Sequence, residues 1–224
     1  MGNLSTFKFF ILSGLQDSGV YKPLYFLLVF VLYILIIIVN LTLIFIVTVD
    51  RSLHEPMYIF ICSLCANGLY GTVGFYPKLL LDLQSDIHII SYSWCMIQTY
   101  VIYSSALCEM TILTVMCYDR YVAICRPLQY HNIVTPRAVL KLLVLAWSYP
   151  LLSAAIGTLL TSRIPICGSH IYKLFCDNAS MVIWDGSVDL PIGVRNALAI
   201  QFLILPPLLN PFIYGLQLPR IRKQ

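Results

Sequence analysis

Few side chains in this sequence can ionise, and several of them stand together in the stretch MCYDRYVAICRPLQYH at 116–131. It places Asp119 and Arg120 directly behind an apolar run that contains one further acid, Glu109. On a helix, the eleven residues from Glu109 to Arg120 make three turns and about 20° of rotation, so both lie on one face about 16 Å apart. An Arg at the edge of a bilayer can pair with a neighbouring acid or reach water, whereas one at the centre costs several kcal/mol. The simplest interpretation is a charge pair at a membrane boundary.

The same residue types give no support for catalysis. The sequence has no metal-ligand spacing, no nucleophile paired with a base and no phosphate-binding glycine loop. We therefore expect no enzyme activity, no metal and no cofactor.

The composition indicates that these groups lie in a lipid bilayer. Hydrophobic residues make up 59% of the 224, charged residues only 11%, and the mean hydropathy is +0.84. Soluble domains carry about 25% charged residues. The net charge of +4 is small and the basic residues are scattered, so nucleic acid is not an expected partner.

Five apolar windows are long enough to cross a membrane, which takes about 20 residues of helix. The sequence therefore predicts an all-α membrane protein in which residues 1–218 form one transmembrane domain and 219–224 a short cytosolic tail. The five predicted helices span about 24–49, 57–80, 94–118, 140–162 and 196–218.

The orientation of the chain follows from charge and from possible modification sites. Eight Lys and Arg residues fall on the side of the carboxy-terminal tail and six on the other. Glycosylation sequons at Asn3 and Asn178 lie on the amino-terminal side, as do Cys95, Cys167 and Cys176, which could form disulfides only in an oxidising lumen. These signals predict an extracellular amino terminus. A myristoylation pattern at the start of the chain would instead require a cytosolic terminus.

Three motifs resemble those of the odorant receptors, a branch of the rhodopsin-like G-protein-coupled receptors. They are LHEPMYIFI (53–61), MCYDRYVAICRPLQYH (116–131) and PPLLNPFIYGL (206–216). They are long and specific, and the resemblance covers about 3–180 and 188–223. LCANGLYGTVGFYPKLLLDL and ALAIQFLILPPLLNP look most like odorant receptors of fish.

The resemblance implies a rhodopsin-like helical bundle in the plasma membrane. It also implies a small organic odorant as ligand, a heterotrimeric G protein as transducer and a receptor oligomer as a further form. By the same resemblance, Asp119, Arg120 and Tyr121 form an ionic latch whose release lets Arg120 meet the G protein. A second switch element is implied at Asn210, Pro211 and Tyr214.

The remaining site residues are also implied by the resemblance. In the odorant receptors the third helix lines the odorant pocket, and the matching positions in this sequence are Ile102, Tyr103, Ala106 and Leu107. Ordinary helix packing would use the same spacing. The resemblance also pairs Cys95 with Cys176 in a disulfide and leaves Cys167 without a partner.

Glu109 is expected near a polar cluster that includes Asn67 of the second helix. Many such receptors carry an aspartate where this chain has Asn67-Gly68. This departure weakens the case for a bound sodium ion and favours Glu109 as a hydrogen-bonded structural residue.

Two helices of the family pattern have no counterpart in this sequence. Between Cys176 and Ala197 only twenty residues occur, too few to cross a membrane twice. We expect an internal deletion of the fifth and sixth helices with its junction near 182–185, and impaired signalling as a result. The alternatives are a non-signalling, pseudogene-like receptor fragment, which could be retained in the endoplasmic reticulum, and a small transporter. The transporter is disfavoured because no inverted repeat is apparent.

Overall fold

The computed structural model describes residues 9–12, 21–85, 87–163, 170–171, 175–176 and 206–211. Four long helices dominate this part of the chain: α1 (Lys22–Val49), α2 (Pro56–Gln84), α3 (Tyr92–Cys125) and α5 (Pro136–Ser162). All four are long and apolar enough to span a membrane, which confirms the predicted all-α membrane class. Of the fifth predicted helix, 196–218, only 206–211 are described, and they are helical.

The helices begin where their sequences favour a start. A proline occupies the first turn of α1, α2 and α5, where its missing N–H costs nothing. The side chains of Ser91 and Thr135 accept backbone hydrogen bonds at the starts of α3 and α5. Helix α3 continues to Cys125, so Asp119 and Arg120 lie inside the helix rather than past its predicted end at 118. Hydropathy falls where charged residues begin, but these residues are compatible with helix.

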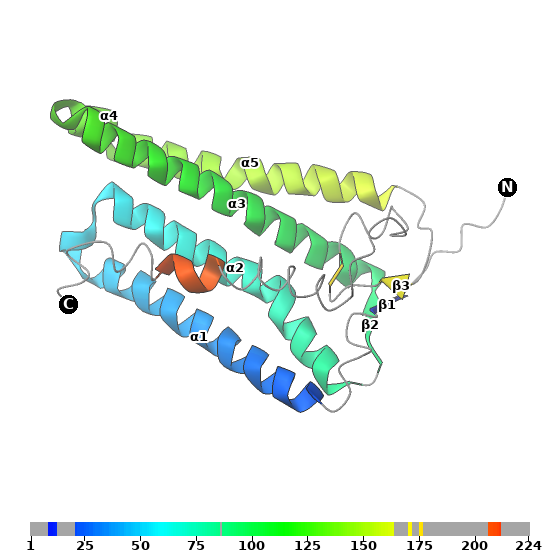
Figure 1. The fold of residues 1–224 in the computed structure, drawn as a ribbon. Helices are drawn as coiled ribbons and strands as arrows, with labels where there is room; N and C mark the ends of the chain where they lie inside the picture. Colours follow the sequence, from blue (N-terminus) through cyan, green and yellow to red (C-terminus); the bar gives the residue numbers. More distant parts are fainter. Residues whose placement is uncertain are drawn as a thin grey trace.

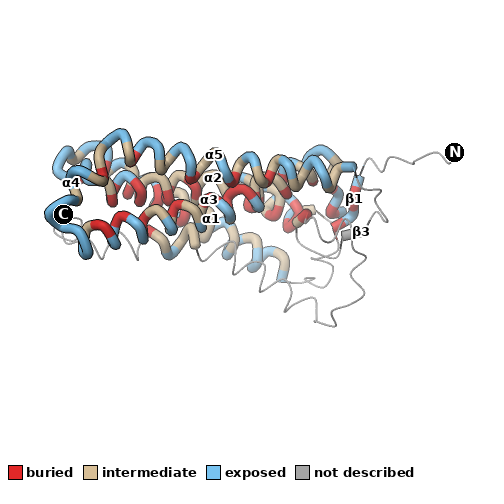
Figure 2. Tube along the Cα trace, turned by 90° about the horizontal axis from the view of Figure 1, so that it is seen from above, coloured by how far each residue is buried: buried red, intermediate tan, exposed pale blue. Residues whose placement is uncertain are grey.

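The helices pack as successive neighbours, α1 on α2, α2 on α3 and α3 on α5 (Figure 1). The largest apolar cluster joins α2, α3 and α5 through residues such as Phe60, Cys108, Ile112 and Ala146. Buried positions follow the facing sides of the helices and exposed positions follow their outer sides (Figure 2). Those outer sides are strongly apolar, as at Phe45, which is 65% exposed. An apolar exterior of this kind suits lipid as the surrounding solvent.

Short elements cover the two ends of the bundle (Figure 1). The 3-10 helices η2 (Arg51–Leu53) and η3 (Pro127–Gln129) and the short helix α4 (Tyr130–Ile133) lie at what we call the α4 end. At the opposite end, called the strand end, β1 (Phe9–Leu12) lies between β2 (Ile89–Ser91) and β3 (His170–Ile171).

The small sheet at the strand end was not predicted from the sequence. β1 pairs antiparallel with β2, with Phe10 opposite Ile90, and parallel with β3. Phe10 is fully buried in a cluster that contains Ile90, Cys95 and Cys176. The sheet therefore ties a segment near the amino terminus to the loops between the helices.

Candidate functional site

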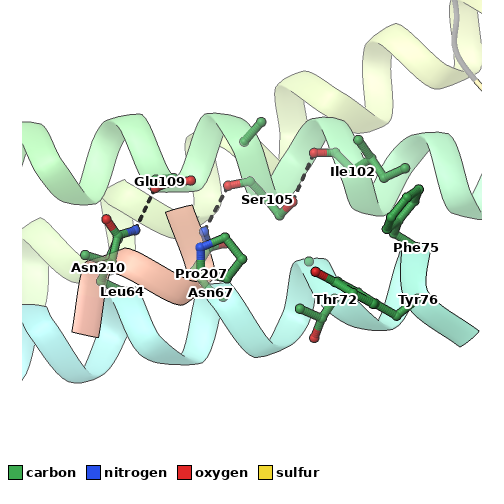
Figure 3. Close-up of a pocket in the computed structure, with 13 residues that line it drawn as sticks. Leu64, Asn67, Thr72, Phe75, Tyr76, Ile102, Ser105, Glu109, Pro207 and Asn210 are labelled. Carbon is green, nitrogen blue, oxygen red and sulfur yellow. Dashed lines mark hydrogen bonds between the residues drawn. The ribbon is translucent and has the colours of Figure 1, made fainter. Parts of the chain in front are cut away.

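A small polar cavity lies between α2, α3 and the helical segment 206–211 (Figure 3). Its volume is about 30 Å³. One water needs roughly 10–15 Å³, so the cavity suits about two or three water molecules and is too small for an organic ligand. We call it the polar cavity, and its lining consists of Leu64, Asn67, Gly68, Gly71, Thr72, Phe75, Tyr76, Ile102, Ser105, Ala106, Glu109, Pro207 and Asn210.

Glu109 and Asn210 meet directly across this cavity. The side-chain amide of Asn210 donates a 2.7 Å hydrogen bond to a carboxylate oxygen of Glu109 (Figure 3). Asn67 donates to the backbone oxygen of Ser105 at 3.0 Å, which connects α2 with the same face of α3. The structure thus brings together three residues that the sequence analysis singled out, Asn67, Glu109 and Asn210.

Asn40 of α1 completes this network and was missed in the sequence analysis. Its side-chain amide donates to the backbone oxygen of Pro207 at 2.8 Å and to that of Ile36, also at 2.8 Å. In a helix, the oxygen of Pro207 would accept from the backbone N–H of residue 211, but Pro211 has none. Asn40 supplies the missing donor. An asparagine in the middle of an apolar span was the signal that could have identified it.

The close approach of 206–211 to α2 depends on Gly68. A Cβ at this position would lie 3.2 Å from the Cβ of Pro207 and 3.3 Å from a side-chain oxygen of Asn40. Of the described residues that line the cavity, Glu109 is the one with a carboxylate. Among the described residues, no three His, Cys, Asp or Glu side chains converge as a metal site.

Asp119 is the centre of a second polar group, at the α4 end. It is 1% exposed, accepts a 2.8 Å hydrogen bond from the hydroxyl of Tyr130, and lies 3.3 Å from a guanidinium nitrogen of Arg120. Burial raises the pKa of the Tyr130 hydroxyl, and the bond to the Asp119 carboxylate raises this pKa further. Tyr130 therefore stays a donor at neutral pH. Tyr121, which the sequence analysis grouped with the pair, is 55% exposed.

The strand end contains the predicted disulfide. Cys95 and Cys176, separated by 81 positions, are joined in the structure. Gln98 supports this link from the next turn of α3, because its side-chain oxygen accepts from the backbone N–H of Cys176 at 2.9 Å. Its amide nitrogen donates to the backbone oxygen of Gly74 on α2 at 3.0 Å. Gln98 was not identified in the sequence.

The four residues predicted to line an odorant pocket separate into two groups. Ile102 and Ala106 line the polar cavity, together with Glu109. Tyr103 and Leu107 do not line it and are 37% and 39% exposed. The polar cavity is therefore not lined by all four residues, and their role in an odorant pocket stays a prediction. Positions 102, 106 and 109 share one face of a helix, whereas 103 and 107 are turned by about 90° and 130° from it.

Several predicted features fall outside the described residues. They are Asn3, Cys167, Asn178, the junction at 182–185, Tyr214 and the tail at 219–224.

Comparison with known proteins gives a consistent result. The sequence model of the olfactory receptor family matches residues 29–186. The chain is 38% identical over 177 residues to olfactory receptor 1D2 of Pongo pygmaeus, covering 79% of this chain and 56% of that protein. It is 31% identical over 217 residues to human olfactory receptor 2G3, covering 96% of this chain and 70% of the relative. For human olfactory receptor 6N1 the identity is 35% over 212 residues, with 91% and 68% covered.

The length of these matches differs among the relatives. The chain spans 56–57% of the length of the 1D2 receptors of orangutan, chimpanzee, gorilla and human.

Proposed function

Because this chain belongs to the olfactory receptor family, a family of G-protein-coupled receptors rather than enzymes, we propose that it is an odorant receptor that binds small organic ligands. In this proposal it couples to a heterotrimeric G protein from the plasma membrane. The observation that carries the proposal is the arrangement at the α4 end, where the buried Asp119 contacts both Arg120 and Tyr130. It has the form of a latch that can be opened.

In this proposal Asp119, Arg120 and Tyr130 each have a role. Asp119 holds Arg120 beside it, and Tyr130 fixes the carboxylate from the other side. Neutralisation or displacement of Asp119 would free Arg120, which is already half exposed, to contact a G protein. Asn210, Pro211 and Tyr214 form the second switch element in this proposal, and the bond from Asn210 to Glu109 is its connection to α3.

The orientation proposed is an extracellular strand end and a cytosolic α4 end. The disulfide at the strand end supports it, because disulfides persist in oxidising compartments. The Lys and Arg side chains support it as well, since they are more frequent on cytosolic sides. Among the described residues, five are near the α4 end (Arg51, Arg120, Arg126, Arg137 and Lys141) and three near the strand end (Lys22, Lys78 and Arg163). Glycans at Asn3 and Asn178 would then be extracellular.

Odorant binding is proposed at Ile102, Tyr103, Ala106 and Leu107 of α3. The polar cavity cannot hold an odorant, so the ligand would contact the exposed Tyr103 and Leu107. In the rhodopsin-like bundle, the fifth and sixth helices complete this pocket. We propose that both are deleted here near 182–185, and the family match that ends at residue 186 supports this position.

The deletion leads us to propose impaired signalling. Without the fifth and sixth helices, the pocket lacks one wall. The sixth helix, whose outward movement would open the cleft for the G protein, is then missing as well. A non-signalling, pseudogene-like receptor is the alternative, either retained in the endoplasmic reticulum or paired with a full-length receptor. The similarity to fish receptors stays a prediction, since the relatives described above are primate.

Expression of the 224-residue chain with an odorant panel and a cAMP readout tests the proposal. We expect a weak response or none, and a clear response once a fifth and sixth helix from a related receptor are inserted at 182–185. A robust response of the chain alone would refute the impairment. Failure of the completed receptor to respond to any odorant, despite surface expression, would contradict odorant sensing.

A further inference from the structure

A second and much larger cavity opens on the outer side of α2 and α3, at the strand end. Its volume is about 510 Å³, within the range of roughly 300–1,000 Å³ of small-molecule sites. It lies apart from the polar cavity, and no described residue lines both. We call it the α2–α3 groove.

The sequence explains why a groove forms here. At the base of the groove the two helices touch, because Gly74 has no side chain to separate them. A Cβ there would lie 2.7 Å from a methyl carbon of Val101. Three residues later, Pro77 interrupts the hydrogen bonding of α2 and permits a bend. Figure 1 shows α2 turning away from α3 in its second half. The helices are held close at Gly74 and diverge beyond Pro77, which produces a wedge-shaped opening.

The walls of the groove are apolar and stiff. Val73, Ile89, Ile97 and Val101 are β-branched, and such side chains have few rotamers. Trp94 lines the groove near the start of α3 and is 65% exposed. Tryptophan is enriched at membrane interfaces, so the strand end of the groove lies close to the head-group region.

Among the described residues that line the groove, Lys78 alone carries a charge, and this charge is already compensated. Lys78 forms an ion pair with the buried Asp82 and donates to the backbone oxygen of Ile89 at 2.9 Å. An ammonium has three donors, and within the described residues two of those of Lys78 are used. An anionic head group would approach the carboxylate of Asp82, whereas a neutral hydroxyl oxygen could accept the remaining N–H without that repulsion.

We propose that the α2–α3 groove binds a membrane sterol, with the sterol hydroxyl at Lys78 and the ring system against Trp94 and the β-branched wall. A rigid ring system loses less conformational entropy on binding than a flexible acyl chain does, which favours a sterol over a fatty acid or a phospholipid chain. None of the described residues that line the groove belongs to the odorant or G-protein sites proposed above.

Photolabelling tests this assignment in membranes that contain the whole chain. A diazirine derivative of cholesterol is irradiated in these membranes, and the labelled peptides are identified by mass spectrometry. We expect label within 73–81 and 94–101, competition by cholesterol, and little competition by oleate. Label spread equally over α1 and α5 would overturn the site, and equal competition by oleate would overturn the sterol.

Variants that fill or alter the groove provide the second part of the test. Ile97→Trp and Val73→Trp each place bulk in the groove from an exposed position and should lower labelling about tenfold. Val144→Trp, at an exposed position of α5, is the matched control and should label like the wild type. Formation of the Cys95–Cys176 bond on non-reducing gels verifies the fold of each variant. Lys78→Met should weaken labelling by the hydroxyl sterol but not by its 3-deoxy analogue. Unchanged labelling in both groove-filling variants would overturn the proposal.

Discussion

The side-chain amide of Asn40 lies 2.8 Å from the backbone oxygen of Pro207, across 167 positions of the sequence. This contact joins the first helix to the segment that contains Asn210 and Pro211. It satisfies a carbonyl that Pro211 leaves without its usual helical donor. The hydrocarbon of a bilayer offers no replacement for such a donor, so the bond helps to hold the last helical segment in place.

Replacement of Asn40 by Ala should therefore destabilise the bundle. We expect a loss of about 1–2 kcal/mol, in the range of hydrogen bonds between membrane helices. Thermal unfolding in detergent, followed by reaction of the buried Cys65 and Cys108 with a thiol dye, measures it. Thr42→Ala, at an exposed position of the same helix, is the control. Equal unfolding temperatures of the two variants would show that the Asn40 bond contributes nothing.

Glu109 should act as a hydrogen-bond acceptor rather than as a charge. Glu109→Gln keeps an oxygen for the amide of Asn210 and should unfold close to the wild type. Glu109→Leu leaves that amide unpaired and should cost about 1–3 kcal/mol. The same dye assay compares the two. If Gln were as damaging as Leu, the negative charge itself would be needed, as expected for a bound cation.

The bond from Tyr130 to Asp119 should appear in the dependence of stability on pH. Because the folded state raises the pKa of Tyr130 above its ordinary value of 10.0, this group stabilises the fold fully below that pH and loses the contribution as pH rises above it. Stability of the wild type should fall more steeply above about pH 10 than that of Tyr130→Phe. At neutral pH the variant should be less stable by about 1–3 kcal/mol, since Asp119 loses a donor. Parallel pH profiles would contradict this role.

The two glycines Gly74 and Gly157 should respond to the same substitution in opposite ways. A Cβ at Gly74 would lie 2.7 Å from Val101, so Gly74→Ala must separate α2 from α3, at a cost of about 1–3 kcal/mol. Within the described part of the chain, no atom beyond the adjoining backbone of α5 lies within 4 Å of a Cβ at Gly157, and Ala there should be neutral or stabilise α5 by up to about 1 kcal/mol. Unfolding of the two variants side by side measures the difference. Equal stability would mean that α2 and α3 do not touch at Gly74.

Hydropathy was sufficient to predict α1, α2, α3 and α5, because lipid requires long uninterrupted apolar helices. Hydropathy could not show that α3 continues past Asp119, because a helix can extend beyond the apolar segment that crosses the membrane. The sheet around Phe10 depends on strands brought together by distant loops, and its short segments have no distinctive pattern. The acid inside an apolar run singled out Glu109, and motif resemblance identified Asp119 and Asn210. It did not identify Asn40, Gln98 or Tyr130, whose roles depend on the backbone groups and side chains that they reach in the fold.

The proposed receptor function requires that the α4 end face the cytosol and the strand end the exterior. A self-complementing fluorescent protein tests this in living cells, with its large fragment in the cytosol and its small fragment fused to either terminus of the chain. We predict fluorescence with the fragment after Gln224 and none with the fragment before Met1, whether the protein reaches the surface or stays in the endoplasmic reticulum. Fluorescence from the amino-terminal fusion alone would contradict the orientation and, with it, the receptor function proposed.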